Sequence, residues 1–260
     1  MNIVFRNANF YYQKEGNGSV LVLLHGFLHS STMWADYKKR WLKDNYTVLT
    51  IDLPGHGKSG FFNHLTIVNM AEIVNAILEK ENIEKATIIG HSLGGYTGLS
   101  FAEKFPNKVE KLILFHSSAF ADTEEVKQKR DTWLKIIDRH PAMFVKNVVE
   151  FLYEKENIEK FHERISKDIE NAKEIGFEGY KEVIKAMRDR LDTSKVLQSE
   201  TNVFFIAGKL DKIIPEEISQ KQIRMIKNGS GVILEKASHM SFVEDAESAF
   251  EQINVFLKEE

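Results

Sequence analysis

The sequence predicts an α/β protein built around a mostly parallel sheet. Short β-branched and aliphatic runs alternate along the 260 residues with longer segments whose apolar residues recur at helical spacing. The short runs are nearly continuous in apolar residues, which is typical of strands covered by helices on both faces. With 43% hydrophobic and 28% charged residues, the chain can bury a substantial core.

The central strands are expected where an apolar run ends in a turn. They span Val20–Leu24, Thr47–Asp52, Ala86–Gly90, Lys111–His116, Asn202–Ala207 and Gly231–Glu235. Two further strands are expected as an edge hairpin in the first 15 residues, which makes an eight-stranded sheet. Apolar residues at helical spacing predict helices over Thr66–Glu81 and around Ala249–Leu257.

One long segment breaks this alternation. From about Ala121 to Gln198 the sequence contains only charged helical patterns, interrupted at Pro141 and at Gly176–Gly179. Because the segment lies between two central strands, it must leave the sheet and return. We therefore predict a core of residues 1–120 and 199–260 with an all-helical insertion, 121–198, after the sixth strand. The insertion is expected to lie over the carboxyl edge of the sheet as a lid; a helical decoration remote from the site is the alternative.

Charge and composition narrow the classes of partner. The net charge is −3, and neither a basic stripe nor a polybasic amphipathic helix is present, so we expect no nucleic-acid or membrane partner. No apolar run approaches the ~18 residues of a membrane span. The absence of cysteine excludes disulfides and thiolate chemistry. Residues 1–10 lack the pattern of a signal peptide, so a cytoplasmic protein is the default expectation. The oligomeric state stays open.

The most informative motif is Gly90-His-Ser92-Leu-Gly94. A β-branched strand leads directly into it, and a helix rich in small residues follows without a loop. A serine on so sharp a turn adopts a strained backbone conformation, and the residues two positions away on either side must be small. The turn would hold the Ser92 hydroxyl above the sheet, where a base and a substrate can reach it.

A serine hydroxyl needs further groups to act as a nucleophile. Because a free alcohol is weakly nucleophilic near neutral pH, Ser92 requires a base, and His239 is the candidate. The imidazole in turn needs a partner that fixes its tautomer, and Asp211 is the candidate. Backbone N–H groups are expected to stabilise the developing oxyanion, the first of them from Leu93, the residue after the nucleophile.

The motif and four further landmarks at strand ends resemble the α/β-hydrolase superfamily, from about Val20 to Leu257. The landmarks are His25-Gly-Phe27, Asp52-Leu-Pro-Gly-His-Gly-Lys-Ser59, Gly208-Lys-Leu-Asp211 and Ser238-His-Met240. The order serine, aspartate, histidine is the one this fold uses. The resemblance implies a serine hydrolase with the α/β-hydrolase fold, a Ser92–Asp211–His239 triad and the N–H of Phe27 as the second oxyanion donor.

Further residues are expected to contact substrate, to brace turns or to lie at the surface. Phe27, His116 and Met240 are expected to contact substrate, although His116 is equally compatible with a buried structural role. His25, His56 and Asp52 are expected to brace turns, and His91 to be packed. The remaining histidines are expected at the surface: His29, His64, His140 and His162. We expect no metal and no organic cofactor, since neither a phosphate-binding loop nor a dinucleotide fingerprint occurs.

The leading hypothesis is hydrolysis of a small carboxylic ester or related acyl compound through an acyl-enzyme. Serine at this sharp turn argues against epoxide opening and halide displacement, for which members of the superfamily use aspartate at the same place. Carbon–carbon bond hydrolysis, thioester hydrolysis and cofactor-free perhydrolysis use the same triad and stay open. A lyase resembling the menaquinone-pathway synthase, with Arg130 or Arg139 reaching in from the lid, is a second class. A non-enzymatic small-molecule receptor is the third.

Overall fold

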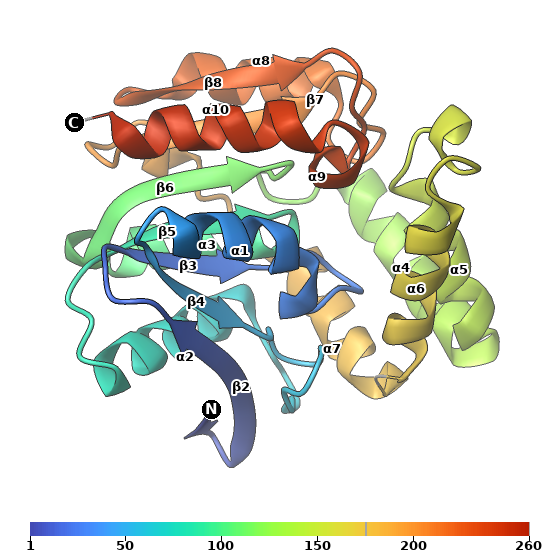
Figure 1. Cartoon of the computed structure of the whole chain (residues 1–260). Coiled ribbons are helices and arrows are strands. Elements are labelled where there is room, and N and C mark those ends of the chain that lie inside the picture. Colours follow the sequence, from blue (N-terminus) through green and yellow to red (C-terminus); the bar gives the residue numbers. More distant parts are fainter. Residues whose placement is uncertain (175, 260) are drawn as a thin grey trace.

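The computed structural model describes residues 1–174 and 176–259, which form an eight-stranded sheet flanked by helices (Figure 1). The spatial order is β1-β2-β4-β3-β5-β6-β7-β8. β1 pairs with β2 and β2 with β4 in antiparallel fashion, whereas every other neighbouring pair is parallel. The strands are β1 (Asn2–Phe5), β2 (Ala8–Glu15), β3 (Val20–Leu24), β4 (Thr47–Ile51), β5 (Ala86–His91), β6 (Val109–Phe115), β7 (Val203–Gly208) and β8 (Gly229–Leu234).

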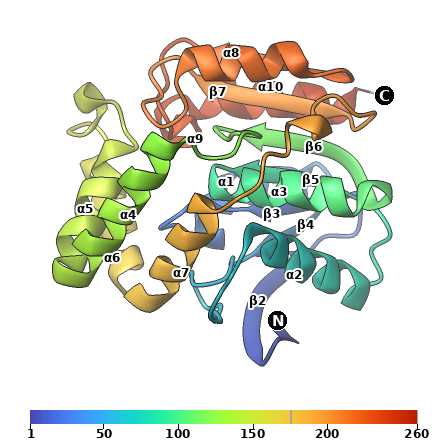
Figure 2. The same ribbon diagram turned by 180° about the vertical axis from the view of Figure 1, so that it is seen from behind.

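The predicted mostly parallel sheet with a hairpin at one edge is confirmed. The central strands β4 and β5 are buried at every position, because helices cover both faces. α1 and α10 cover the face seen in Figure 1, and α2, α3 and α8 cover the face seen in Figure 2. These helices, with the short α9, are α1 (Ala35–Lys43), α2 (Ile67–Lys80), α3 (Leu93–Lys104), α8 (Glu216–Met225), α9 (Ser241–Glu244) and α10 (Ala246–Lys258).

The start of α2 illustrates how local sequence sets a helix boundary. Thr66 Oγ1 accepts a hydrogen bond from the N–H of Asn69 at 3.1 Å, and Asn69 Oδ1 accepts one from the N–H of Thr66 at 3.2 Å. This capping box satisfies one of the free N–H groups of the first turn. Apolar residues at helical spacing then bury one side of the helix, which explains why the predicted bounds are close to the observed ones.

The segment 121–198 is helical, with no strand among its described residues. Pro141 opens α5 at the first helical position, and Gly176 is the N-cap of α7, so both coincide with helix boundaries, whereas Gly179 lies in the first turn of α7 and does not interrupt it. In Figure 1 these helices lie beyond the arrowheads of the strands, at the carboxyl edge of the sheet. They are α4 (Glu124–Arg139), α5 (Pro141–Phe151), α6 (His162–Glu174) and α7 (Phe177–Arg188).

Side-chain contacts join this segment to the loops of the sheet edge. The Phe27 ring, in the loop after β3, lies 6.5 Å from the Trp133 ring and 5.6 Å from the Tyr180 ring, measured between centroids. The Ser238 hydroxyl lies 2.8 Å from the carbonyl oxygen of Leu152. Among the helices of the described residues, none combines the length and the apolar composition that spanning a lipid bilayer requires.

Candidate active site

Ser92 occupies a strained turn between β5 and α3. Its φ of 49° and ψ of −111° place it in the left-handed half of backbone space, which a non-glycine residue seldom adopts. A Cβ on Gly90 would lie 2.3 Å from the Gly94 carbonyl oxygen, and one on Gly94 would lie 2.1 Å from the Leu24 carbonyl oxygen. The close approach inferred from the sequence is therefore present, and it explains why both positions are glycine.

Hydrogen bonds to the neighbouring strand hold this turn. The N–H of Ser92 donates to the carbonyl oxygen of Phe115 at 2.9 Å, and the hydroxyl of Ser117 donates to the carbonyl oxygen of Ser92, also at 2.9 Å. Ser117 is fully buried just beyond β6. No local pattern singles out Ser117, because only the pairing of β5 with β6 brings it to the turn.

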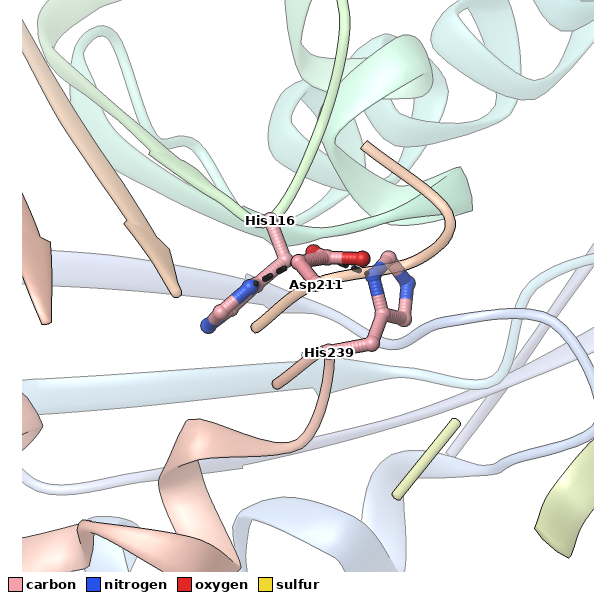
Figure 3. Close-up of side chains that lie close together, drawn as sticks. All are labelled: His116, Asp211 and His239. Carbon is pink, nitrogen blue, oxygen red and sulfur yellow. Dashed lines mark hydrogen bonds and ion pairs between the residues drawn. The ribbon is translucent and has the colours of Figure 1, made fainter. Parts of the chain in front are cut away.

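His239 and Asp211 form a buried pair, as Figure 3 shows. The distance from His239 Nδ1 to Asp211 Oδ2 is 2.8 Å. The other carboxylate oxygen, Oδ1, accepts from the N–H groups of Ile213 at 2.8 Å and Ile214 at 3.0 Å. Burial raises the pKa of Asp211, but the charge of His239 and hydrogen bonds from His116 and His239 outweigh it and hold that pKa well below its usual range.

A second imidazole donates to the same carboxylate oxygen (Figure 3). His116 Nδ1 lies 3.0 Å from Asp211 Oδ2, and His116 Nε2 lies 2.6 Å from the Ser241 hydroxyl oxygen. Burial lowers the pKa of His116, so the neutral ring donates from Nδ1 and accepts from Ser241 at Nε2. His116 is fully buried and both nitrogens are engaged, which agrees with the buried role and not with the alternative of pocket lining.

The backbone of His239 is tied to the strand that carries Ser92. The carbonyl oxygen of His239 accepts a hydrogen bond from His91 Nε2 at 2.9 Å. Burial holds the pKa of His91 well below its usual value, so this ring is neutral. The hydroxyl of Ser92 and His239 make no hydrogen bond in the described part of the chain, so that arm of the triad stays a prediction. Such bonds are often longer before substrate binds.

The loop that carries His239 is also held by Glu244. Glu244 Oε2 accepts from the N–H of Ser238 at 2.9 Å, and Glu244 Oε1 accepts from the N–H of Glu154 at 2.8 Å. One carboxylate thus bridges the loop after β8 and the segment 121–198. Met240, expected to contact substrate, is fully buried at the N-cap of α9 and borders neither of the cavities described for the chain.

The loop after β3 is braced by two buried histidines. His56 Nε2 accepts from the N–H of Leu28 at 3.1 Å, and His25 Nε2 accepts from the N–H of Leu53 at 2.8 Å. Burial lowers the pKa of His25 to about 4 and that of His56 well below its usual value, so both rings are neutral acceptors. Leu28 has a φ of 64°, a conformation that this bracing helps to hold.

The two expected oxyanion donors, Phe27 and Leu93, each follow a residue at the Ser92 turn: Phe27 follows Gly26, and Leu93 follows Ser92 itself. A Cβ on Gly26 would lie 3.6 Å from Ser92 Cβ, so the backbone before Phe27 passes directly over the serine. Leu93 is the first residue of α3, and its N–H has no acceptor within the helix. The Phe27 side chain is buried and packs against aromatic rings of the segment 121–198.

The structure also shows where Asp52 and the histidines expected at the surface lie. Asp52 braces its turn as expected, because its carboxylate accepts from the N–H groups of Ser31 at 2.8 Å and Lys58 at 2.9 Å. The expectation that His29 lies at the surface is wrong: it is 5% exposed, and its Nε2 lies 3.8 Å from Asp168 Oδ2. The other three histidines expected at the surface are exposed, namely His64, His140 and His162.

Two sets of residues bear on the lyase alternative and on the possibility of a metal site. Arg130 is buried against Asp122, at 2.7 Å from Nε to Oδ2, whereas Arg139 is exposed. His116, Asp211 and His239 offer ligand atoms within 4.8 Å of one another, close enough to hold a metal ion. However, each Nδ1 must carry a proton to bond to the ionised Asp211, and a metal would displace both protons. The donor set fits a hydrogen-bond network better than a metal.

Comparison with known proteins gives the family of this chain. Residues 19–246 match the family model described as the alpha/beta hydrolase fold. The chain belongs to the α/β-hydrolase family. Among curated relatives, a pimeloyl-[acyl-carrier protein] methyl ester esterase of Pectobacterium carotovorum is 26% identical over 96% of this chain and 98% of its own length. An uncharacterized hydrolase, YugF, of Bacillus subtilis is 29% identical over 96% of this chain and 95% of its own length.

Solved structures give the same fold for this α/β hydrolase. A thermophilic esterase from Thermogutta terrifontis superposes with a TM-score of 0.90 at 24% identity, over 96% of this chain and 93% of that one. The enol-lactonase from Burkholderia xenovorans LB400 also superposes with a TM-score of 0.90, at 22% identity over the whole of both chains. Family membership and esterase relatives make this chain an esterase-like hydrolase.

Proposed function

We propose that this α/β hydrolase is a serine esterase that cleaves a small carboxylic ester through an acyl-enzyme. The observation that carries the proposal is the pairing of a strained serine at the β5–α3 turn with a buried Asp211–His239 couple at the same edge of the sheet. Relatives named as esterases over nearly the full length of the chain support it.

In the first step, Ser92 Oγ attacks the ester carbonyl carbon while His239 Nε2 takes the hydroxyl proton. The carbonyl π electrons move onto the oxygen, and the N–H groups of Leu93 and Phe27 stabilise that charge. Because these donors are fixed in the backbone, they need little reorganisation when the charge develops. The imidazolium formed at His239 is stabilised by the ionised Asp211.

The tetrahedral intermediate then collapses. The bond between the former carbonyl carbon and the alkoxy oxygen breaks, and His239 gives its proton to that oxygen, so an alcohol leaves and an ester of Ser92 remains. A water molecule repeats the sequence, with His239 as base and then as acid, and releases the carboxylic acid and free Ser92. No cofactor enters this balance.

His116 serves in this proposal as a positioning residue. Its donation to Asp211 Oδ2, with those of His239, Ile213 and Ile214, gives the carboxylate four hydrogen-bond donors. A buried carboxylate so satisfied stays ionised and keeps one orientation. His239 is therefore held with its proton on Nδ1 and with Nε2 free to act as the base.

The helical segment 121–198 would act as a lid over the acyl site. Phe27 belongs to the loop that would supply an oxyanion donor, and its ring packs against Trp133, Phe144 and Tyr180. A movement of the segment would therefore reshape the apolar wall beside Ser92. This arrangement suits the acyl part of a small ester, which needs apolar contacts and exclusion of water.

The experiment is active-site labelling with a fluorophosphonate probe, combined with a panel of p-nitrophenyl esters from acetate to decanoate. We expect labelling at Ser92, its loss in Ser92→Ala, and a preferred acyl length that reports pocket depth. Ser100→Ala, a buried serine two turns further along α3, is the matched control and should keep labelling. A wild-type protein that is folded but neither labelled nor active on any ester would contradict the proposal.

A further inference from the structure

A cavity lies away from the proposed catalytic residues. Its volume is about 720 Å³, within the ~300–1,000 Å³ typical of small-molecule sites. It is formed by the start of α2, one side of α3 and the end of α7, which Figure 2 shows on the same side of the molecule. Ser92, Asp211, His239 and Phe27 do not belong to its described lining.

Much of the cavity wall is apolar. Leu65, Ile67, Tyr96 and Ala186 border it and are each 5% exposed or less, so they form a firm surface. Leu191 borders it from the end of the segment 121–198 and is 71% exposed. Such walls favour the apolar part of a ligand, while polar groups at one end would set its orientation.

Arg190 borders the same cavity, and its guanidinium is not fully used by the protein. Its side chain is only 8% exposed, and its Cζ lies 4.1 Å from the centre of the Tyr96 ring. Nη1 donates to Asp122 and, at 2.9 Å, to the Met187 carbonyl oxygen. Nε is buried and has no hydrogen-bond partner in the described part of the chain. An unpaired donor on a buried cation is costly, so this atom favours an acceptor.

The charges around Arg190 leave an excess of positive charge. Asp122 also accepts from Arg130 Nε at 2.7 Å, so two buried guanidinium groups share one buried carboxylate. The acidic groups on the cavity wall also have cationic partners: Glu103 pairs with Lys195 and Glu182 with Lys185, while Asp189 shares Arg188 with Asp131. The three buried groups Arg130, Arg190 and Asp122 by themselves carry a net charge of +1, which an anion would neutralise.

The first turn of α2 adds donors to the same cavity. Thr66, Ile67 and Val68 are its N-cap and first two helical residues, and all three border the cavity. The N–H groups of Ile67 and Val68 have no acceptor within the helix, and the helix dipole places positive potential there. The Thr66 side chain already caps the N–H of Asn69. This helix terminus and Arg190 border the same cavity, and both favour a carboxylate.

We propose that this cavity binds a small organic carboxylate with an apolar tail, at a site separate from the proposed catalytic serine. The carboxylate takes the end formed by Arg190 and the first turn of α2, and the tail lies against the apolar wall. The proposal does not depend on Ser92 acting as a nucleophile. Such a ligand could be a carboxylic acid released by the protein's own reaction or one from elsewhere, and both present the same chemistry.

The test is titration calorimetry on the full chain with octanoate as the probe. Octanamide has the same tail without the charge, and acetate has the charge without the tail. We expect octanoate to bind, and both comparison compounds to bind at least about tenfold more weakly, as expected for loss of a charge-assisted hydrogen bond or of most apolar contact. Failure of octanoate to bind, or equal binding of octanamide, would overturn the proposal.

Two substitutions locate the binding. Arg190→Gln should weaken octanoate binding at least about tenfold, while the matched Arg139→Gln, on an exposed arginine at the end of α4, should leave it unchanged. Ala186→Phe fills the cavity without altering the guanidinium, so it tests the site even if Arg190→Gln fails to fold. If octanoate bound beside Ser92 as a reaction product, neither cavity substitution would alter its affinity, and the proposal would be wrong.

The same titration separates this proposal from the esterase proposal. In the Ser92→Ala variant, octanoate binding should persist although ester hydrolysis is lost. Hydrolysis assayed with a saturating octanoate concentration shows whether octanoate also occupies the catalytic site, because octanoate bound there competes with the ester and octanoate confined to this cavity does not. In both cases Arg190→Gln and Ala186→Phe should weaken the tight binding, and tight binding that persists in both variants would overturn the proposal.

Discussion

His91 donates a hydrogen bond of 2.9 Å from Nε2 to the carbonyl oxygen of His239, across 148 residues of sequence. His91 is the last residue of β5 and immediately precedes the proposed nucleophile. The same bond therefore ties the loop of the proposed base to the strand that carries Ser92. Because both histidines are buried, this bond forms in a region with little water to compete for it.

Substitution of His91 tests this tether. In His91→Leu the carbonyl oxygen of His239 loses its donor, and we expect kcat to fall about 10²-fold through misplacement of the base, with KM nearly unchanged. His91→Gln keeps a donor at similar reach and should recover most of the activity. Steady-state kinetics on one p-nitrophenyl ester provide the measurement. Equal losses in both variants would show that ring packing, not the hydrogen bond, matters.

Asp211→Asn tests the proposed acid. The amide replaces one accepting oxygen by a donating NH₂ group and can force the wrong tautomer on His239. We therefore expect turnover to fall about 10⁴-fold. Thermal unfolding and circular dichroism should confirm that the protein is folded. Asp36→Asn, at an exposed position on α1, is the control and should be fully active. Near-normal turnover in Asp211→Asn would mean that another group serves as the acid.

His116→Gln tests the positioning role through the pH profile. When His116 no longer donates to Asp211 Oδ2, the carboxylate is free to interact more strongly with His239 and favours its protonated form. Because the base acts unprotonated, the acidic limb of kcat/KM should move to higher pH, by up to about one unit. Ser241→Ala removes only the contact on the far side of the ring and should move it less. Lower activity with an unmoved limb would indicate a structural role alone.

Acid should destabilise the protein through its buried neutral histidines. The pKa of His25 is lowered from about 6.5 to about 4 by burial, so between these pH values the unfolded chain binds a proton that the folded chain does not. Stability is therefore fully present above about pH 6.5 and declines as the pH falls toward about 4; His25 alone contributes about 3 kcal/mol to this loss. His56 and His91 act in the same direction.

Urea denaturation at pH 7.5, 6 and 5 measures this effect. We expect the midpoint to fall at each step, and His25→Gln to show a shallower decline, with exposed His162→Gln as the control. Asp211 does not interfere in this range, because a lowered aspartate pKa contributes stability that is lost only below about pH 4. A wild-type midpoint independent of pH over this range would refute the expectation.

Much of the fold could be read from local sequence. β3 has the predicted bounds, and each bound of the other central strands lies within two residues of the predicted one. The glycines around Ser92 announced the sharp turn because no other residue fits two backbones so close together. The periodicity of strands and helices depends on neighbours along the sequence, and so does the place of a long helical segment. These features can therefore be predicted from the sequence.

The contacts that complete the candidate site depend on the packing of distant segments. Whether His116 faces a ligand or a carboxylate was undecidable from its neighbours, and the answer comes from Asp211 and Ser241, 95 and 125 residues further along. The burial of His29 follows in the same way from Asp168 on α6. Spacing and side-chain size along the chain are enough to predict the sheet, the sharp turn and the candidate residues of the triad, because these features depend on near neighbours. Which buried imidazoles share Asp211, and where Arg190 keeps an unused donor, depends on how the layers pack, because these hydrogen bonds join residues far apart in the chain.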